Sequence, residues 1–254
     1  MPLARRMLPN GALDLMRQIA LFCGAYLLYR LARGMVYDQT IAAFDHARQV
    51  VQLERSTHVF VEHSVQAWTV GTGFLDDVAS WVYLNSHFIV TTCTLAFIYV
   101  FRNEHFYFVR NMFMVAMGIA LVGYIAYPTA PPRMFPELGF ADSVAEFTGV
   151  SEDSVNALFN PFAAVPSMHV CFALMLSFPM IRMARHTWVK AAWSAYAPLV
   201  TFVVVATGNH WIFDAFTGAC VGAVSAFAAQ ALFARARPEA WAWEPALAGP
   251  ARAG

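Results

Sequence analysis

Long apolar stretches with few charges constrain this chain more than any other feature of its sequence. A helix that crosses a bilayer needs about 20 mostly apolar residues. Six stretches qualify, at residues 12–33, 79–101, 108–128, 166–182, 188–207 and 211–234, and the fourth of them is short and contains Pro179. The sequence therefore predicts an all-α, polytopic membrane protein built as a bundle of six transmembrane helices.

The composition excludes most classes of soluble protein. Of the 254 residues, 13% are charged and 59% are hydrophobic, whereas a soluble domain carries about a quarter charged residues. Such a chain cannot cover a water-facing surface of its size. Its formal net charge is zero, which leaves no basic face for a nucleic-acid backbone. These numbers exclude an ordinary soluble enzyme, a disordered chain and a nucleic-acid-binding protein.

The distribution of basic residues predicts the orientation of the bundle. If both termini lie in the cytoplasm, eleven of the 16 Lys and Arg residues fall in inner segments and five in outer segments. This bias agrees with the positive-inside rule, and it leaves the outer loop at 129–165 acidic. We therefore expect a multi-pass protein of the cell membrane with both termini cytoplasmic.

The stretch 38–70 has a different pattern from the apolar runs. Apolar residues such as Ile41, Phe44 and Val51 are interleaved with charged ones, which is typical of amphipathic helices at a membrane interface. We expect extra interfacial helices here, within a single integral-membrane domain over residues 1–234. The tail at 235–254 is rich in Ala, Pro and Gly and is expected to form a loose cytoplasmic end.

Polar residues gather in three segments at the ends of the apolar runs. The segments are 127–133, 160–169 and 207–214, and they contain Arg133, Ser167, His169, His210 and Asp214. The predicted topology places all three segments on the outer face of the bundle. Ionisable groups at membrane helices are costly and commonly functional. We therefore expect one extracytoplasmic site to which all three segments contribute.

Each of these residues suits one task in phosphoryl transfer. Ser167 stands at a predicted helix start, where free N–H groups accept an anion, and the guanidinium of Arg133 matches phosphate oxygens. His210 and Asp214 are four residues apart and share a helix face. The carboxylate can therefore orient one ring nitrogen and leave the other as a nucleophile or base. With His169 as proton donor, the set predicts transfer through a phosphohistidine.

Other interpretations of the same residues stay open at this point. Pro166 and Ser167 can form a simple helix cap, and a His-x-x-x-Asp pair is often a core hydrogen bond. A zinc site needs three or four protein ligands, and here His169, His210 and Asp214 stand near an arginine that repels a cation. We predict no metal and no cofactor. The alternative function is that of a non-enzymatic membrane lipid carrier or scaffold.

The order of these motifs resembles a known family. Arg133, then Pro-Ser-x-His ending at His169, then His-x-x-x-Asp from His210 to Asp214 resemble the type 2 phosphatidic acid phosphatase superfamily of integral-membrane lipid phosphatases. The resemblance runs from about residue 38 to residue 225. Three further pieces are similar to its inositol phosphorylceramide synthase-like branch, namely Leu53-Glu54-Arg55 with Glu62 and Gln66, residues 128–133, and Thr207-Gly208-Asn209-His210.

This resemblance implies a metal-independent lipid phosphate phosphatase or phosphotransferase. His210 corresponds to the nucleophile, and Asp214 corresponds to the carboxylate that orients it. His169 corresponds to the acid that protonates the leaving alcohol, while Arg133 and Ser167 correspond to phosphate binders. The implied substrate is a lipid phosphate or phospholipid, and the implied acceptor is water or a polyol such as inositol.

The chain departs from the broader superfamily at two sites of positive charge. Ala126 stands where the superfamily has a lysine, and Val203-Val204 stand where it has a Ser-Arg pair. Thr207 and Asn209 are the expected substitutes as phosphate-binding residues. Because two cationic contacts are missing, we expect a substrate of lower charge, a phosphodiester lipid rather than a phosphate monoester.

Overall fold

Regular structure in this protein is helical throughout the part of the chain that can be described. The structure is a computed structural model, and it describes residues 8–36, 39–150, 162–236, 238 and 242–243. Within these ranges the one β-type contact is an isolated bridge between Thr129 and Ala163. The predicted all-α class is confirmed. Most of the predicted tail at 235–254, and residues 151–161 of the acidic loop, lie outside the described residues.

Four helices of the described chain are long and apolar enough to cross a membrane. They are α5 (Phe74–Phe101), α6 (Asn103–Ala126), α10 (Thr187–Ala206) and the continuous segment Ile212–Ala236. The last segment comprises α11 (Ile212–Phe227), the π-helical turn η3 (Ala228–Phe233) and α12 (Ala234–Ala236). These helices indicate a membrane protein, as the apolar runs predict.

Two further helices stand at the other predicted spans. The first is α2 (Gly11–Val36), a helix of 26 residues that carries Asp14 in its first turn. The second is α9 (Met168–Met183), which has 16 residues and contains Pro179 without ending there. The predicted span 166–182 begins two residues before the helix, because Ser167 has an extended backbone and occupies the N-cap position. At 16 residues, α9 is shorter than the roughly 20 that a span needs.

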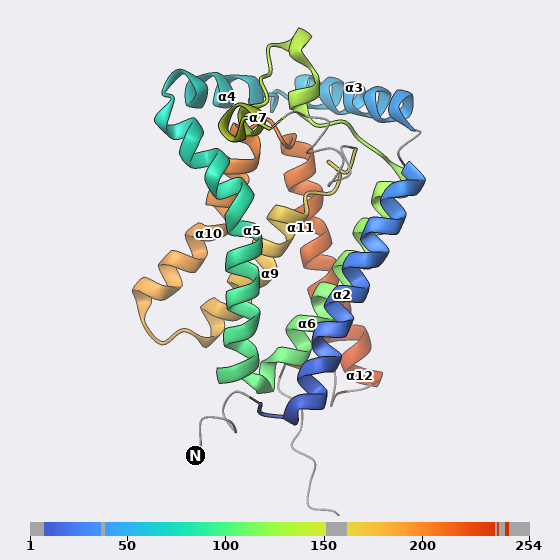
Figure 1. Cartoon of the computed structure of the whole chain (residues 1–254), viewed down its shortest axis with the longest axis vertical. Helices are drawn as coiled ribbons and strands as arrows, with labels where there is room; N and C mark the ends of the chain where they lie inside the picture. Colours follow the sequence, from blue (N-terminus) through green and yellow to red (C-terminus); the bar gives the residue numbers. More distant parts are fainter. Residues whose placement is uncertain (1–7, 37–38, 151–161, 237, 239–241, 244–254) are drawn as a thin grey trace, which may run out of the picture.

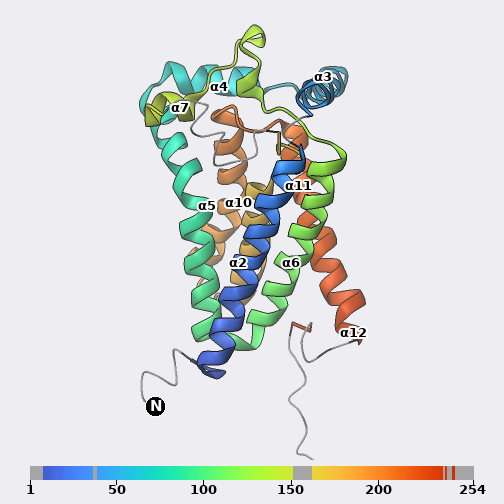
Figure 2. The same ribbon diagram turned by 45° about the vertical axis from the view of Figure 1, so that its right-hand side comes forward.

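The helices run up and down along one long axis, and a layer of shorter helices covers one end (Figures 1 and 2). After α2, the chain crosses this end through α3 (Thr40–Ser56) and α4 (Glu62–Gly71). It returns there after α6 through η1 (Pro132–Met134), η2 (Pro136–Leu138) and α7 (Ser143–Thr148). The starts of α9 and α11 and the ends of α6 and α10 consequently lie together beneath this layer.

The first helix of the 38–70 stretch, α3, packs on the bundle partly through small residues. On α3, Ala43 and Ala47 are fully buried, while Ile41 on another face is 82% exposed. The buried face belongs to an aromatic cluster with Phe135 and Trp211, so it ties α3 to the start of α11. The prediction of helices in this stretch agrees with the structure, and their placement at a membrane interface stays a prediction.

Candidate active site

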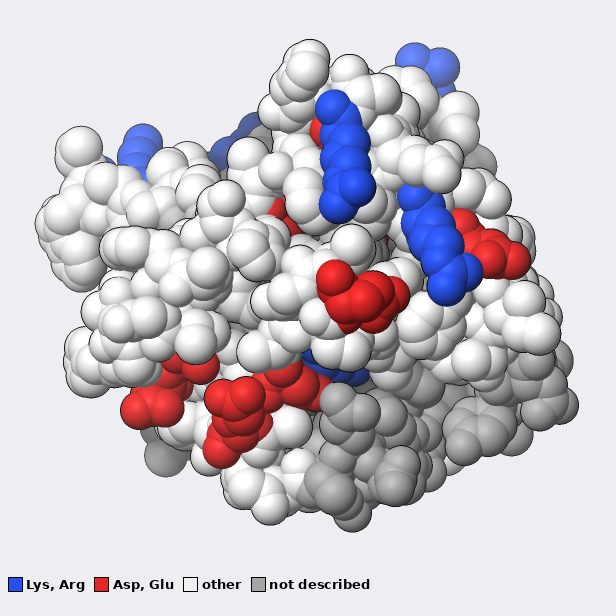
Figure 3. Space-filling model, turned by 90° about the horizontal axis from the view of Figure 1, so that it is seen from above, with Lys and Arg blue, Asp and Glu red and all other residues white. Residues whose placement is uncertain are grey.

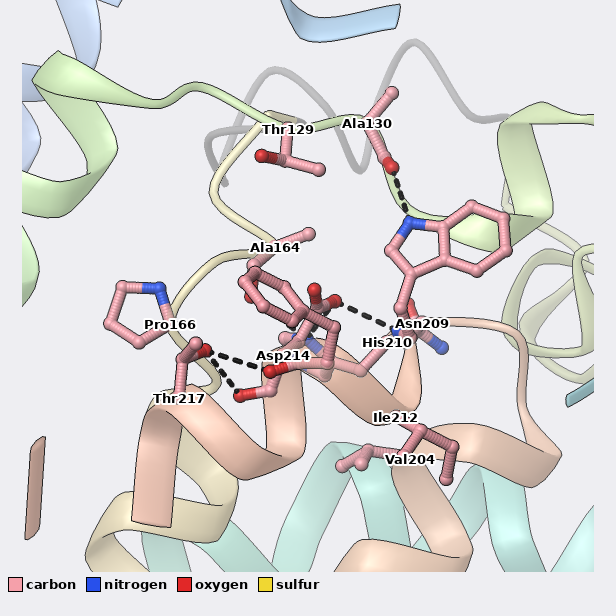
Figure 4. Close-up of polar contacts among 12 residues, drawn as sticks. Thr129, Ala130, Ala164, Pro166, Val204, Asn209, His210, Ile212, Asp214 and Thr217 are labelled. Carbon is pink, nitrogen blue, oxygen red and sulfur yellow. Dashed lines mark hydrogen bonds and ion pairs between the residues drawn. The ribbon is translucent and has the colours of Figure 1, made fainter. Parts of the chain in front are cut away.

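The three polar segments meet at the covered end of the bundle. The rings of His169 and His210 lie 5.6 Å apart between centroids, although 41 positions separate them in the sequence. The N–H of Ser167 donates to the carbonyl of Asp214 at 2.9 Å, which joins the start of α9 to the first turn of α11. Figure 4 shows Pro166, His210 and Asp214 around this junction. The segments that carry the predicted site residues are thus neighbours in space.

The surroundings of His210 fix which ring nitrogen carries the proton. Its Nδ1 lies 3.2 Å from Oδ2 of Asp214 and 3.1 Å from the carbonyl oxygen of Ala164. Both neighbours are hydrogen-bond acceptors, so Nδ1 must be the protonated nitrogen. In the neutral ring Nε2 then keeps an available lone pair. Asp214 is itself fixed, because its Oδ2 also accepts from the N–H of Trp211 at 2.8 Å.

His169 is enclosed by aromatic rings. Tyr83 stacks on it at 4.7 Å between centroids, and His87 lies 4.5 Å away. From sequence, His87 is either a cavity residue or a structural one. Its ring stacks on Phe172 at 5.0 Å, so it belongs to the same cluster of rings as His169. This packing holds the His169 ring in one orientation beside His210.

Ser167 does not use its hydroxyl as a helix cap. It occupies the N-cap position of α9 without a side-chain capping bond, and its buried Oγ has no hydrogen-bond partner among the described residues. The simple capping interpretation therefore does not account for this serine. Gly218 permits the close packing here, since a Cβ at that position would lie 2.2 Å from the Ser167 carbonyl oxygen.

Arg133 is held at the same end by the turn that precedes His210. Its backbone N–H donates to the carbonyl of Gly208 at 2.8 Å, and Nη1 donates to Oδ1 of Asn209. Its Nε lies 3.4 Å from Oδ2 of Asp142. Asn209 in turn donates to Oγ1 of Thr207 at 3.0 Å. Asn209 therefore links Thr207 to Arg133 through hydrogen bonds within the protein.

A comparison with protein families identifies the family of this chain. A family model described as the PAP2 superfamily matches residues 48–228. The chain belongs to the PAP2 superfamily. The matched region contains every predicted site residue, from Arg133 to Asp214. Comparisons with curated proteins and with solved structures gave no match.

PAP2 membership supports one part of the sequence interpretation directly. It indicates a phosphatase-type enzyme that acts on lipid phosphates in the membrane. The motif order Arg, Pro-Ser-x-His and His-x-x-x-Asp predicts this superfamily, and that prediction is confirmed. The narrower synthase-like branch stays a prediction from the sequence.

In this PAP2 protein, sequence reasoning missed the role of two glutamates on the covering helices. Glu54 of α3 accepts from the N–H of Phe213 at 2.8 Å, and Glu62 of α4 accepts from the N–H of Ile212 at 2.8 Å. With Asp214 on Trp211, three carboxyl groups occupy the first N–H groups of α11. A helix start normally leaves such groups unpaired. The glutamates therefore fix the turn that carries His210.

The two glutamates also interact with each other. Both are buried, with exposed fractions of 1% for Glu54 and 0% for Glu62, and their side chains hydrogen-bond. Among the described residues no lysine or arginine pairs with either of them. Burial, together with the hydrogen bond and charge of Glu62, raises the pKa of Glu54 to about 9. Glu54 is therefore protonated at neutral pH.

A buried glutamine joins the second covering helix to the loop that carries Asp142. Gln66 donates to the carbonyl of Ala141 at 2.9 Å and accepts from its N–H at 3.1 Å. Gly208 packs against this amide with a φ of +67°, and a Cβ there would lie 2.6 Å from Nε2 of Gln66. Because a side chain cannot fit at that point, glycine is required in the turn before His210.

Proposed function

We propose that this PAP2 protein transfers a phosphoryl group from a lipid phosphate through a phosphohistidine at His210, with water or an alcohol such as inositol as acceptor. The observation that carries the proposal is the contact set of His210. Its Nδ1 faces two acceptors, Asp214 and Ala164. The ring of His169 lies 5.6 Å from the ring of His210 between centroids. An oriented imidazole beside a second imidazole is the arrangement that nucleophilic catalysis with a separate proton donor requires.

The proposed reaction has two steps. In the first, Nε2 of His210 attacks phosphorus, the bond from phosphorus to the alcohol oxygen of the lipid breaks, and His169 gives that oxygen its proton. In the second, His169 takes a proton from water or the acceptor alcohol. The acceptor oxygen attacks phosphorus, and the P–N bond breaks to restore neutral His210. The Nδ1–H contact with Asp214 stabilises the positive charge of the ring in the first step.

Phosphate binding in this proposal depends on Ser167 and Arg133. The unpartnered hydroxyl of Ser167 and the N–H groups at the start of α9 donate to phosphate oxygens. The side chain of Arg133 is 15% exposed, and it supplies positive charge from inside the protein. On the outer surface of this end, acidic and basic side chains are scattered among uncharged ones (Figure 3). We propose Thr207 and Asn209 as residues that position Arg133.

The proposed setting is a bundle of six spans, α2 and α9 included, with both termini cytoplasmic and the site extracytoplasmic. The basic-residue bias of the sequence supports this orientation. In it, α3 and α4 lie at the outer membrane interface. Apolar side chains exposed on them, Ile41 at 82% and Trp68 at 59%, are then available to contact lipid.

The substrate follows from the charge of the site. Where the broader superfamily has additional cations, this chain has Ala126, Val203 and Val204. A monoester such as phosphatidic acid carries about two negative charges near neutral pH, against one for a phosphodiester. We expect the purified protein to turn over phosphatidylinositol faster than phosphatidic acid of the same acyl chains. Quantitative mass spectrometry of both lipids and their products measures this preference.

The same assay separates hydrolysis from transfer. With phosphatidylinositol as donor, transfer to isotopically labelled inositol should yield a labelled phosphodiester of two inositols, and hydrolysis should yield unlabelled inositol phosphate. With phosphatidic acid as donor, the corresponding products are labelled inositol phosphate and free phosphate. Turnover of phosphatidic acid well above that of phosphatidylinositol would contradict the phosphodiester proposal. Absence of turnover of any lipid phosphate by folded protein would contradict the enzymatic proposal as a whole.

A further inference from the structure

Two adjoining cavities open at the end of the bundle opposite His210. The first has a volume of about 450 Å³ and is lined by Arg102, Arg182 and Arg185 among others. The second has a volume of about 390 Å³ and shares Arg182 and Trp243 with the first. Arg182 is 13 residues after His169 on the same helix, so the two ends of α9 are about 20 Å apart. The cavities are therefore separate from the candidate active site.

The first cavity gathers three arginines that form no ion pair with a carboxylate of the described residues. Arg102 comes from the junction of α5 and α6, Arg182 from α9, and Arg185 from the turn before α10. Within the described residues none of the three pairs with a carboxylate. The one acidic residue in the lining is Glu104, whose side chain is 57% exposed and lies 3.8 Å from His105. Convergent unpaired guanidinium groups are a phosphate-binding arrangement.

Trp243 forms the wall between the two cavities. It is buried, at 8% exposed, and its ring stacks on His105 at 4.1 Å between centroids. The guanidinium carbon of Arg182 lies over the same ring at 5.1 Å. The ring of Phe108 lies 5.5 Å from the ring of Trp243 between centroids. Trp243 therefore lines both cavities and marks the boundary between them.

The second cavity continues the first with a lining that is partly apolar, since Arg182 and Gln230 line it as well. Its lining includes Phe108 of α6, Phe178 of α9 and Ala226 of α11. Phe178 is 47% exposed, which opens this lining to the side of the bundle. The two cavities together therefore present a cationic pocket joined to an aromatic and aliphatic groove.

We propose that this composite site binds an anionic phospholipid, with its phosphate among the three arginines and an acyl chain in the groove of Phe108 and Phe178. The charge and the apolar groove each match one half of such a lipid. The positive-inside rule alone accounts for basic residues at one end of a bundle. It does not account for their convergence from separate junctions around one cavity that continues into a groove with aromatic side chains in its lining. The occupant is thus a lipid rather than a soluble phosphate compound.

The test compares two double variants of the full chain, each lacking two basic residues at this end. R102Q/R185Q removes two arginines of the pocket and leaves the stack of Arg182 on Trp243 intact. K190Q/R235Q is the matched control, since both residues are exposed and neither lines a cavity. Both are made in a His210→Asn background to prevent turnover of the probe. Native mass spectrometry measures retention of phosphatidylglycerol and phosphatidylcholine that have the same acyl chains.

We expect the control to retain phosphatidylglycerol in preference to phosphatidylcholine, and R102Q/R185Q to bind phosphatidylglycerol about 25-fold more weakly, since each basic residue near an anionic surface contributes roughly fivefold. Equal affinity of the two double variants would overturn the proposal. Displacement of the lipid by excess inorganic phosphate would also overturn it, because it would assign the pocket to a soluble phosphate. Both results are independent of whether His210 is catalytic.

Discussion

His210→Asn should reduce turnover of lipid phosphates at least about a thousandfold, with the protein still folded. Loss of a catalytic nucleophile commonly costs this much or more. The asparagine amide can still donate toward Asp214 and Ala164, the two acceptors that face Nδ1. It has no nucleophilic nitrogen lone pair, so the chemical step is lost while the local hydrogen bonds are kept. The measurement is kcat on the preferred lipid in detergent, with the thermal unfolding midpoint measured in parallel.

His186→Asn is the matched control for this prediction. His186 is an exposed histidine before α10, at the other end of the bundle, and its replacement should leave kcat unchanged. A His210→Asn variant that turned over lipid at the rate of the control would refute the nucleophile assignment. That result would favour the non-enzymatic alternative, a lipid carrier or scaffold, because a carrier has no need of a nucleophilic nitrogen at this position.

Glu54→Gln should make the protein more stable than the wild type at high pH. In the folded protein, burial and the contact with Glu62 raise the pKa of Glu54 from 4.5 to about 9. The folded state therefore binds a proton that the unfolded state has released, over the window from about pH 4.5 to pH 9. Stability present below that window is lost as the pH rises through it, by up to about 1.4 kcal/mol per pH unit.

Glutamine removes this loss because it needs no proton to remain neutral. Its Oε1 can still accept from the N–H of Phe213, and its amide can donate to Glu62. Near pH 5 the two proteins should unfold at similar temperatures. Near pH 9 the variant should unfold on the order of 10 °C higher, since 1 kcal/mol corresponds to a few degrees in a protein of this size. Thermal unfolding in detergent across this range measures the difference.

Glu137→Gln serves as the control for the charge change. Glu137 is an exposed carboxylate in the loop after α6, so its replacement should leave the pH profile of the wild type in place. If Glu54→Gln and the wild type lost stability in parallel from pH 5 to pH 9, the pKa of Glu54 would not be raised in the folded protein. Glu54 and Glu62 would then both be ionised where they accept from the first N–H groups of α11.

The convergence of the site could be predicted from sequence because it depends on topology. Once the apolar runs are recognised, the parity of the helices places Arg133, Ser167 and His210 at one end of the bundle. The four-residue spacing of His210 and Asp214 likewise predicts a shared helix face, and their contact is found at 3.2 Å. Such predictions use only periodicity and the direction of each helix.

The role of Glu54 and Glu62 could not be predicted in the same way. Their partners, the N–H groups of Phe213 and Ile212, lie 159 and 150 residues further along the chain. No pattern of neighbouring residues indicates that a covering helix contacts the start of a helix far away in the sequence. The contact of Asn209 with Arg133 could not be predicted for a related reason, since the amide of Asn209 suits a phosphate as well as it suits Arg133. The start of α9 lies two residues after the predicted start, because Ser167 has an extended backbone at the N-cap position.

The central claim is that phosphorus becomes bonded to His210 during turnover, and rapid quenching with a phosphorus-labelled lipid tests it most directly. The wild-type protein, mixed with the lipid, denatured in alkali and digested, should yield a labelled peptide with the phosphate on His210. The label should survive alkali and be lost in acid, and the His210→Asn variant should carry none. Label found on another residue, or lipid turnover at full rate with no label on the protein at any time, would contradict the account.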